Sequence, residues 1–188
     1  MDTSGNKGRM DILNENSVRD LDFEITQVCF HVRETASFLS WLRDLSHRNQ
    51  VVIVCFNADL MAGREHVISA MTHAIRTKKN GTGISSSLEI EALLYAAGSR
   101  QCQEAIQFGV HQGSNNCYLC IYPKNPQVWP LLSTVMTHSP GDWEQMTDEK
   151  INTLISLFGI TNEEIAVTGM NRLKDLVLER VALLEVNK

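Results

Sequence analysis

The fold of this 188-residue chain is decided by residues 51–66, VVIVCFNADLMAGREH. Residues 51–56 are apolar without interruption, which is typical of a strand covered on both faces, so a central strand is expected here. Asn57 or Asp59 can cap the helix that follows, and we extend this helix to about Arg76. A buried strand followed at once by a helix indicates an α/β arrangement.

Arg64 stands out in this helix because it falls within the apolar stripe. At about 100° per residue, its side chain projects between Leu60 and Ile68. It also lies near the helix N-terminus, where the helix dipole disfavours a cation. We therefore expect an anion beside Arg64.

A second helix, expected over residues 86–97, has almost no polar face. Apolar side chains surround it, which predicts burial on several sides. Glu91 interrupts this surface, and an unpaired carboxylate would be costly to bury. We expect Arg64 or Arg100 to be its partner. Two interpretations of Arg64 stay open: a structural ion pair with Glu91, or a contact to a ligand phosphate.

The rest of the pattern predicts a single α/β domain with a mixed central sheet flanked by helices and a helical C-terminal part. Besides residues 51–56, strands are expected over residues 23–30 and 117–122. The alternation of the first of these shifts phase at Gln27, as at a β-bulge. The order and direction of the strands do not follow from the sequence.

Helical spacing and caps place further helices over residues 34–46 and 100–108, and several between residues 147 and 184. In residues 126–143 the sequence pattern predicts only a short helix near Pro130. Residues 1–20 mix polar residues and glycine without periodicity. We expect them to be a disordered lead-in to a domain that spans residues 21–188.

Composition narrows the functional class. The formal net charge is −5 and the sequence pI is about 5.7, so the overall charge of the protein does not attract polyanions. No DNA partner is predicted. Five cysteines lie mostly in apolar runs, and no apolar leader follows Met1, which indicates reduced thiols in a cytoplasmic protein. No apolar run approaches the ~20 residues that cross a bilayer, so no membrane partner is expected.

Motifs for catalysis are missing. Phosphate-binding loops, nucleophile elbows and zinc-binding helix motifs do not occur. Cys117 and Cys120 have redox-motif spacing, but residues three apart on a strand face opposite sides. His66 and His73 would lie about 10 Å apart along a helix, too far to share a metal. We therefore predict no catalytic residue, no metal and no cofactor.

Two features point to binding instead. Arg76, Lys78 and Lys79 form a basic cluster at a helix end, which either compensates the helix dipole or attracts a phosphate backbone. Leu178 lies beyond the core-facing arc of the last helix. It is either an ordinary exposed apolar residue or part of a partner-facing patch.

Three short motifs together resemble one known family. They are FNADLMAGREH at residues 56–66, ExLLYxxGxRQ at residues 91–101, and AI at residues 105–106. In combination they are similar to the small accessory subunits of the archaeal and eukaryotic KEOPS complex, a family that includes the PRPK-binding protein TPRKB. The resemblance is to an archaeal-type member. It covers residues 51–122 well and the helices over residues 147–184 more loosely.

This resemblance implies a non-catalytic protein that binds the small atypical kinase/ATPase subunit of KEOPS. It also implies tRNA binding, at the single-stranded 3′ CCA end in archaeal members, during threonylcarbamoyladenosine synthesis. On the matching positions, the expected RNA contacts are Arg64, His66 and Arg100, with Arg76, Lys78 and Lys79 attracting the backbone. The kinase contact is expected on the last helix, at Leu178, Val181 and Ala182.

Two alternatives to this function stay open. One is a small-molecule enzyme that uses Arg64, Glu91 and His66 in a cleft beside the strand over residues 51–56. The other is a purely structural adaptor that binds the kinase and never touches RNA. An enclosed pocket around the three side chains would favour the enzyme, whereas packed or solvent-exposed side chains would favour an adaptor.

Overall fold

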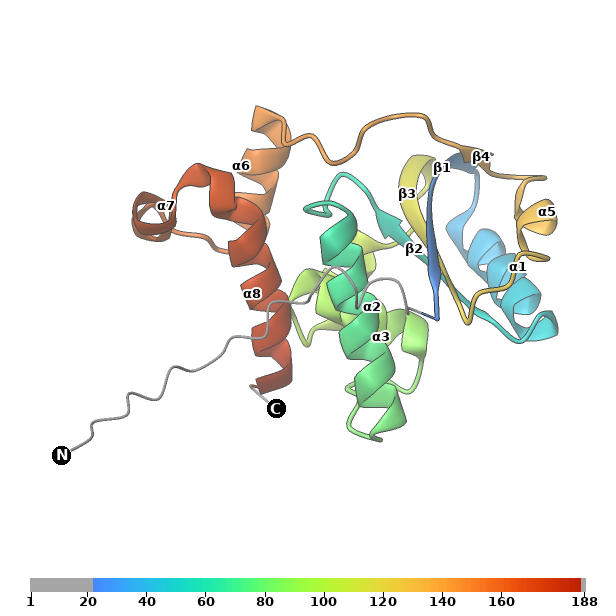
Figure 1. The fold of residues 1–188 in the computed structure, drawn as a ribbon. Helices are drawn as coiled ribbons and strands as arrows, with labels where there is room; N and C mark the ends of the chain where they lie inside the picture. Colours follow the sequence, from blue (N-terminus) through green and yellow to red (C-terminus); the bar gives the residue numbers. More distant parts are fainter. Residues whose placement is uncertain (1–21, 187–188) are drawn as a thin grey trace.

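A four-stranded sheet forms the centre of the computed structural model, which describes residues 22–186 (Figure 1). The strands lie in the order β2-β3-β1-β4, and they comprise β1 (Glu24–Val32), β2 (Val52–Asn57), β3 (Gly113–Tyr122) and β4 (Thr137–His138). The expected single α/β domain with a helical C-terminal part is confirmed. The lead-in expected over residues 1–20 lies outside the described residues.

All neighbouring strands in the described sheet pair antiparallel, so the sheet is not mixed as expected. β1 and β2 run in the same direction, but β3 lies between them and opposes both. The strand expected at the centre of the sheet is β2, and it lies at the edge. Its apolar composition arises from helices on both of its faces, and such cover does not require a strand on each side.

The β-bulge expected at Gln27 is wrong. β1 pairs with β3 in one uninterrupted register from Glu24 to Val32. The phase shift in the sequence has another cause: Ile25 packs on the core of one sheet face, whereas Val28 lies in the core of the other. The strand thus changes its buried face along its length without gaining a residue.

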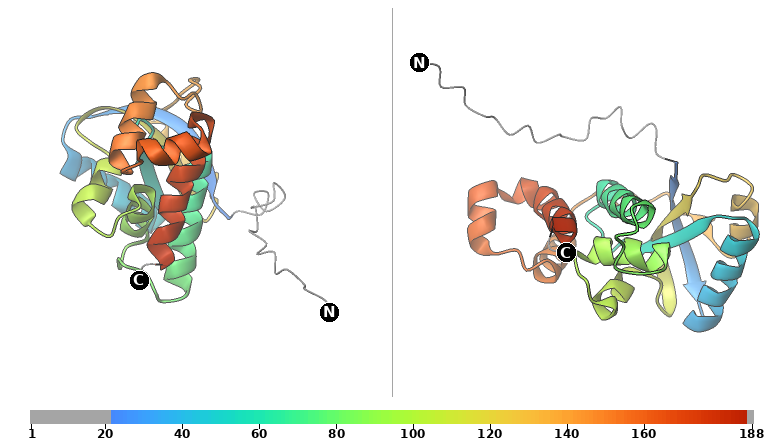
Figure 2. Two further views of the ribbon diagram at one scale, coloured as in Figure 1. Left: turned by 90° about the vertical axis from the view of Figure 1, so that its left-hand side faces the viewer. Right: turned by 90° about the horizontal axis from the view of Figure 1, so that it is seen from below.

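Helices cover both faces of the sheet, and Figure 2 shows the resulting layers from two further directions. One face packs against α1 (Thr35–Arg48) and α5 (Trp129–Leu132). The other packs against α2 (Arg64–Lys79) and α3 (Leu88–Ala97), with α8 (Leu173–Val186) outside them. Successive residues of β2 therefore enter different cores: Val54 contributes to the α2 and α3 side, and Cys55 to the α1 side. Cys117 and Cys120 likewise lie in different cores, as predicted.

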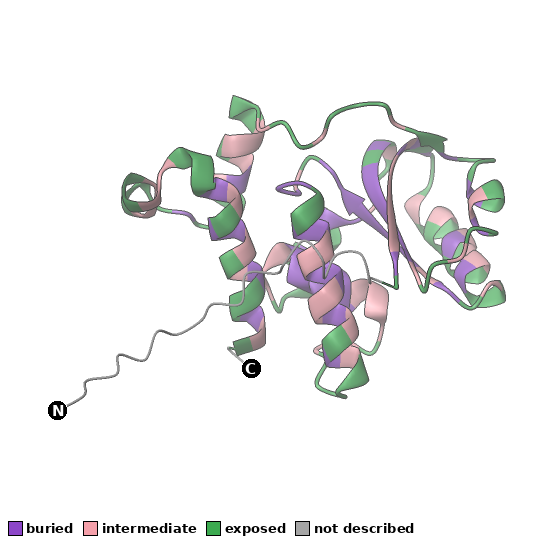
Figure 3. Ribbon diagram, viewed as in Figure 1, coloured by how far each residue is buried: buried purple, intermediate pink, exposed green. Residues whose placement is uncertain are grey.

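The shorter helices surround these layers. They are α4 (Cys102–Ala105), η2 (Ile106–Phe108), α6 (Asp148–Leu157), α7 (Asn162–Thr168) and η3 (Met170–Arg172). Figure 3 shows that burial concentrates in the sheet and on the inward faces of the helices, while α7 is largely exposed or half-buried. No helix within residues 22–186 is both long and apolar enough to cross a membrane.

Local sequence explains where several helices begin and end. The Ser87 side chain accepts a hydrogen bond from the Ile90 N–H at the start of α3, and Gly98 ends that helix in the left-handed conformation, with φ 58°. Thr161 and Glu164 form a capping box at the start of α7, within the region where caps in the sequence predicted helices. Helix starts were therefore predicted more accurately where a capping side chain is present, as in α3 and α7, than where it is absent, as in α2.

Candidate nucleic-acid interface and partner surface

Arg64 does not occupy the position that its sequence context predicts. α2 begins at Arg64, several residues after the predicted caps, and the Arg64 side chain is exposed. Its guanidinium donates a hydrogen bond to the Ile25 carbonyl oxygen at 3.2 Å. Glu91 lies near Thr77, about 20 Å along α2 from Arg64 at 1.5 Å per residue. The predicted pair of Arg64 with Glu91 is therefore wrong.

An anion does lie beside Arg64, but it binds the backbone N–H of Arg64 and not its guanidinium: this anion is Glu144, a residue that sequence analysis missed. Its Oε1 accepts hydrogen bonds from the Arg64 backbone N–H at 2.6 Å and from the Tyr118 hydroxyl at 3.2 Å. Its Oε2 accepts one from Lys174 Nζ at 3.1 Å. Burial alone would raise the pKa of Glu144, but the hydrogen bonds from Arg64 and Lys174 outweigh burial and lower it. The carboxylate thus caps α2, where an anion is stabilised by the helix dipole.

Gly63 makes room for this carboxylate. Its φ is 116°, a backbone conformation that residues with a side chain rarely adopt, and a Cβ built there would overlap Glu144 Oε2. The only sequence signal for the site was a glycine directly before a helix that lacks a capping side chain. Glu144 comes from a region without readable periodicity, and its partner cannot be deduced from spacing.

His66 is part of the core and is not a surface contact. Its Nδ1 accepts a hydrogen bond from the Ala62 N–H at 3.1 Å, and its Nε2 donates to the Ala96 carbonyl oxygen at 2.9 Å. This arrangement requires the neutral ring with its proton on Nε2. Burial lowers the pKa of His66 to about 4. The residue joins the start of α2 to the end of α3, so the predicted RNA contact is wrong.

Glu91 is fully buried and forms no ion pair within the described part of the chain. Its Oε1 accepts hydrogen bonds from the Thr77 hydroxyl and the Ile84 N–H, both at 3.1 Å, and its Oε2 accepts one from the Ser85 N–H at 2.6 Å. Backbone and hydroxyl donors thus solvate the carboxylate in place of a cation. Glu91 anchors the loop between α2 and α3.

The basic cluster at the end of α2 divides into cations with different surroundings. Arg76 Nη2 pairs with Glu185 of α8, and His73 Nδ1 lies 2.7 Å from the same carboxylate oxygen. Lys78 Nζ donates to the Ser86 carbonyl oxygen at 2.5 Å. Lys79 is exposed and makes no recorded hydrogen bond or ion pair among residues 22–186. Lys79 is therefore the cation of the cluster that is most accessible to a ligand.

Arg76 and Lys79 line one groove of about 330 Å³ between the end of α2 and the sheet. The aromatic residues Phe23 and Tyr122 also line it. Arg64 and Arg100 do not, and Arg64 lies about 22 Å from Lys79 along α2 at 1.5 Å per residue. The residues predicted to contact RNA therefore do not form one continuous site.

The residues predicted to bind a partner on α8 also divide. Val181 is fully buried in the core, which excludes it from an exposed patch. Leu178 is half-buried and Ala182 is exposed. Two more apolar residues that sequence analysis did not select are exposed nearby on α8, Leu183 at 39% and Val186 at 76%. Leu178, Ala182 and Val186 are spaced four residues apart, so they share one helix face.

The side chains of the alternative enzyme site do not meet in a cleft. His66 and Glu91 are packed within the structure, and neither of the two most prominent pockets is lined by them or by Arg64. No group of three or more His, Cys, Asp or Glu side chains within residues 22–186 could hold a metal ion. The geometry therefore offers no support for the enzyme interpretation at these residues.

Comparisons with known proteins match most of the chain. Residues 30–185 match the family model described as kinase binding protein CGI-121. The chain is 28% identical to the Regulatory protein Cgi121 of Methanocaldococcus jannaschii over 132 aligned residues. The aligned region covers 70% of this chain and 82% of that protein. The family match extends from β1 into α8, so it includes Leu178 and Ala182 of α8 and most of the groove lining, but not Asp22 and Phe23.

We predict that Glu91→Ala lowers the free energy of unfolding by about 3 kcal/mol, because three donors lose their shared acceptor. Urea denaturation of the wild type and variant measures this change. Glu104→Ala, which removes an exposed carboxylate, is the control and should change stability by less than about 0.5 kcal/mol. Equal effects of the two substitutions would contradict the role of Glu91 as an anchor.

We predict that His66 makes the fold sensitive to acid. The folded pKa of about 4 lies below the ordinary 6.5, so the unfolded chain binds the proton first as pH falls. The contribution of His66 to the free energy of unfolding is at its full value above pH 6.5. Between pH 6.5 and pH 4 it decreases by about 1.4 kcal/mol for each pH unit that the pH falls. His66→Gln should remove this pH dependence, whereas His47→Gln, at an exposed position, should retain it. Urea midpoints measured across this pH range test the difference.

Proposed function

The chain belongs to the CGI-121 family of kinase-binding proteins, and on this premise we propose that it is a non-catalytic accessory subunit that binds a kinase. The family resemblance drawn from the motifs is confirmed, and the archaeal relative is named as a regulatory protein. The resemblance to KEOPS subunits supports a finer proposal. The partner is the atypical kinase/ATPase subunit, and the complex acts in the cytoplasm on tRNA during threonylcarbamoyladenosine synthesis.

The apolar outer face of α8 is the observation that carries the kinase proposal. The inner face of α8 already packs on α2 and α3 through Leu173, Val177 and Val181. A helix packed on one side needs apolar residues on that side alone. Leu178 and Ala182 nevertheless continue an apolar stripe on the opposite side, toward Val186. Such a stripe suits a groove on a partner protein.

Charged residues beside this stripe indicate the character of the partner surface. Asp175 and Glu179 are exposed, and at about 100° per residue they lie on the same side of α8 as Ala182. The outer face of α8 thus combines apolar and acidic residues, and Asp175 also pairs with Arg172 at 2.7 Å. We propose that the kinase supplies an apolar groove with basic residues at its rim, because complementary charge favours correct association.

The groove at the end of α2 is our candidate contact for the tRNA acceptor end. Unpaired bases stack on aromatic side chains, and a modest positive charge attracts the backbone. The groove offers Tyr122 beside Lys79 and Arg76. Arg76 is already neutralised in part by Glu185, so Lys79 supplies most of the local attraction. Arg64, Lys78 and Arg100 lie outside this groove and would contact more distant parts of the RNA.

We predict that Ala182→Asp weakens kinase binding by at least about 100-fold, or about 2.7 kcal/mol, because a carboxylate would be buried without a partner. Ala182 is exposed, so the variant should unfold at the same temperature as the wild type. Isothermal titration with the purified kinase subunit measures the affinity.

The matched control for this experiment is Val135→Asp, which places the same charge on an exposed apolar residue between α5 and β4. It should bind the kinase like the wild type. Undiminished binding by Ala182→Asp would place the kinase contact on another surface.

We predict that Lys79→Ala weakens tRNA binding and reduces the dependence of log K on log salt by about 0.7, the slope for one single-strand phosphate contact. Arg48→Gln removes an exposed cation at the end of α1 and should leave the slope unchanged. Gel shifts over a salt series, with the full chain and a single tRNA, measure both values.

The same gel shifts with tRNA that lacks its terminal CCA identify the part of the RNA that is bound. Weaker binding of the truncated tRNA is expected. Equal binding would reject recognition of the acceptor end, and no binding of either tRNA would favour the purely structural adaptor.

A further inference from the structure

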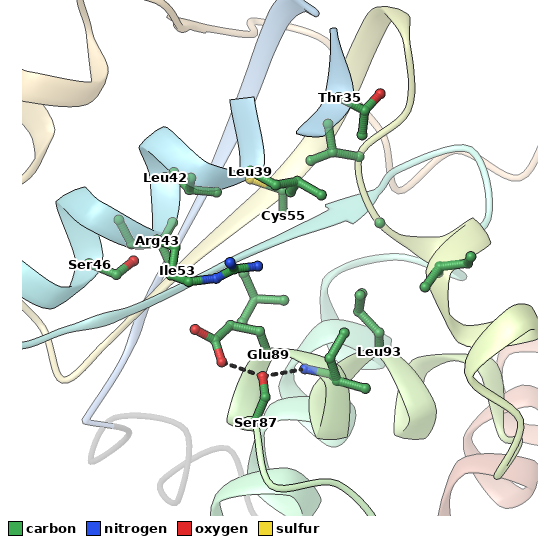
Figure 4. Close-up of a pocket in the computed structure, with 15 residues that line it drawn as sticks. Thr35, Leu39, Leu42, Arg43, Ser46, Ile53, Cys55, Ser87, Glu89 and Leu93 are labelled. Atoms are coloured by element: carbon green, nitrogen blue, oxygen red, sulfur yellow. Dashed lines mark hydrogen bonds between the residues drawn. The ribbon is translucent and has the colours of Figure 1, made fainter. Parts of the chain in front are cut away.

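A second depression, separate from the groove and from the apolar face of α8, follows the open edge of β2 (Figure 4). Its volume is about 500 Å³. Residues of α1, β2 and α3 line it, and the segment from Ile106 to Val110 contributes further side chains. We call this depression the β2 cleft.

The floor of the β2 cleft is the edge of a strand with unused backbone groups. β2 pairs with β3 on one side and with no described strand on the other. The Ala58 N–H donates a hydrogen bond to the Asn116 carbonyl oxygen of β3. In an antiparallel pair the direction of the backbone groups alternates, so the even-numbered residues of β2 point their N–H and C=O groups at β3. Ile53 and Cys55 point theirs away from β3. No hydrogen bond recorded within residues 22–186 uses these outward groups. An unpaired edge of this kind accepts an added strand.

The two walls of the cleft are largely apolar. Leu39 and Leu42 of α1 line one wall, and Ile90 and Leu93 of α3 line the other. Ile106 is 56% exposed and also lines the cleft. Because α1 packs on one sheet face and α3 on the other, the walls flank the strand edge on both sides.

Each wall also carries one charge. Arg43 lies on the α1 side, and Glu89 lies on the α3 side, as Figure 4 shows. Neither residue forms an ion pair in the described part of the chain, and Glu89 Oε2 accepts a hydrogen bond from the Ser87 hydroxyl at 2.6 Å. The cleft therefore presents opposite charges on opposite walls.

We propose that the β2 cleft binds an extended peptide segment of a partner protein, which adds a fifth strand at the edge of β2. Main-chain groups of the peptide bond to Ile53 and Cys55, while alternate side chains enter the apolar space beside α1 and beside α3. A single extended chain fits because the helices on both sides would collide with the covering layers of another sheet.

The charges define the peptide further. Residues of the peptide that face α1 include an acidic one opposite Arg43, and residues that face α3 include a basic one opposite Glu89. Apolar residues occupy the remaining inward positions. This interaction does not depend on the proposed kinase contact, since α8 contributes no residue to the cleft.

Selection from a displayed library of random ten-residue peptides against the full chain tests the proposal. We expect enriched peptides to have apolar residues on alternate positions with an acid in one set and a base in the other. Synthetic copies, labelled with fluorescein, then give affinities by fluorescence anisotropy. N-methylation of a bonded peptide amide should weaken binding about tenfold, because one hydrogen bond to the edge is lost.

Two leucine variants show whether the cleft is the site. Leu39→Asp, at a residue 38% exposed on the α1 wall, should weaken binding at least about tenfold. Leu131→Asp, at a residue 44% exposed on α5 and outside the cleft, should have no effect. Arg43→Glu should reject the selected peptide and accept one with lysine in place of its acid. Failure to enrich any peptide, or binding that tolerates both N-methylation and Leu39→Asp, overturns the proposal.

Discussion

The Glu144 carboxylate connects the sheet to the helices that follow it. It receives the first N–H of α2, the hydroxyl of Tyr118 on β3 and the ammonium of Lys174 on α8. Gly63 makes this contact possible, because any Cβ there would collide with the carboxylate. α2 in turn carries the buried His66 and Thr77, which hold α3 and its preceding loop. One acidic residue in an irregular segment therefore links β3, the start of α2 and α8, and it adds to the apolar packing of α8 on α2 and α3.

Most of the buried polar side chains named above serve the structure of the domain and contact one another or the backbone. His66 and Glu91 use their hydrogen-bonding groups on backbone and hydroxyl partners inside the molecule, so they are not available at its surface. Three surfaces of residues 22–186 are candidates for contacts: the apolar outer face of α8, the groove with Lys79 and Tyr122, and the cleft at the edge of β2. They involve different elements, which would let a kinase, an RNA end and a peptide be bound by one small protein.

The sequence predicted the elements better than their contacts. Periodicity located β1, β2, β3 and most helices because it reports burial of side chains near each other in the chain. It could not give strand order, so β2 was placed at the centre. Burial of Glu91 was predicted, but its partner was not, since backbone N–H groups of a loop leave no mark in the sequence. Among the proposed contact residues, His66 and Val181 are buried, and a resemblance to a family does not show which residues face the core.

Hydrogen exchange of the chain with and without the kinase subunit tests the central claim, that the outer face of α8 is the kinase contact. Mass spectrometry of peptides from α8 and from α1 reports each surface separately. The account predicts slower exchange across residues 173–186 in the complex and unchanged exchange in α1. Slower exchange in α1 or α5 with no change in α8 would contradict it.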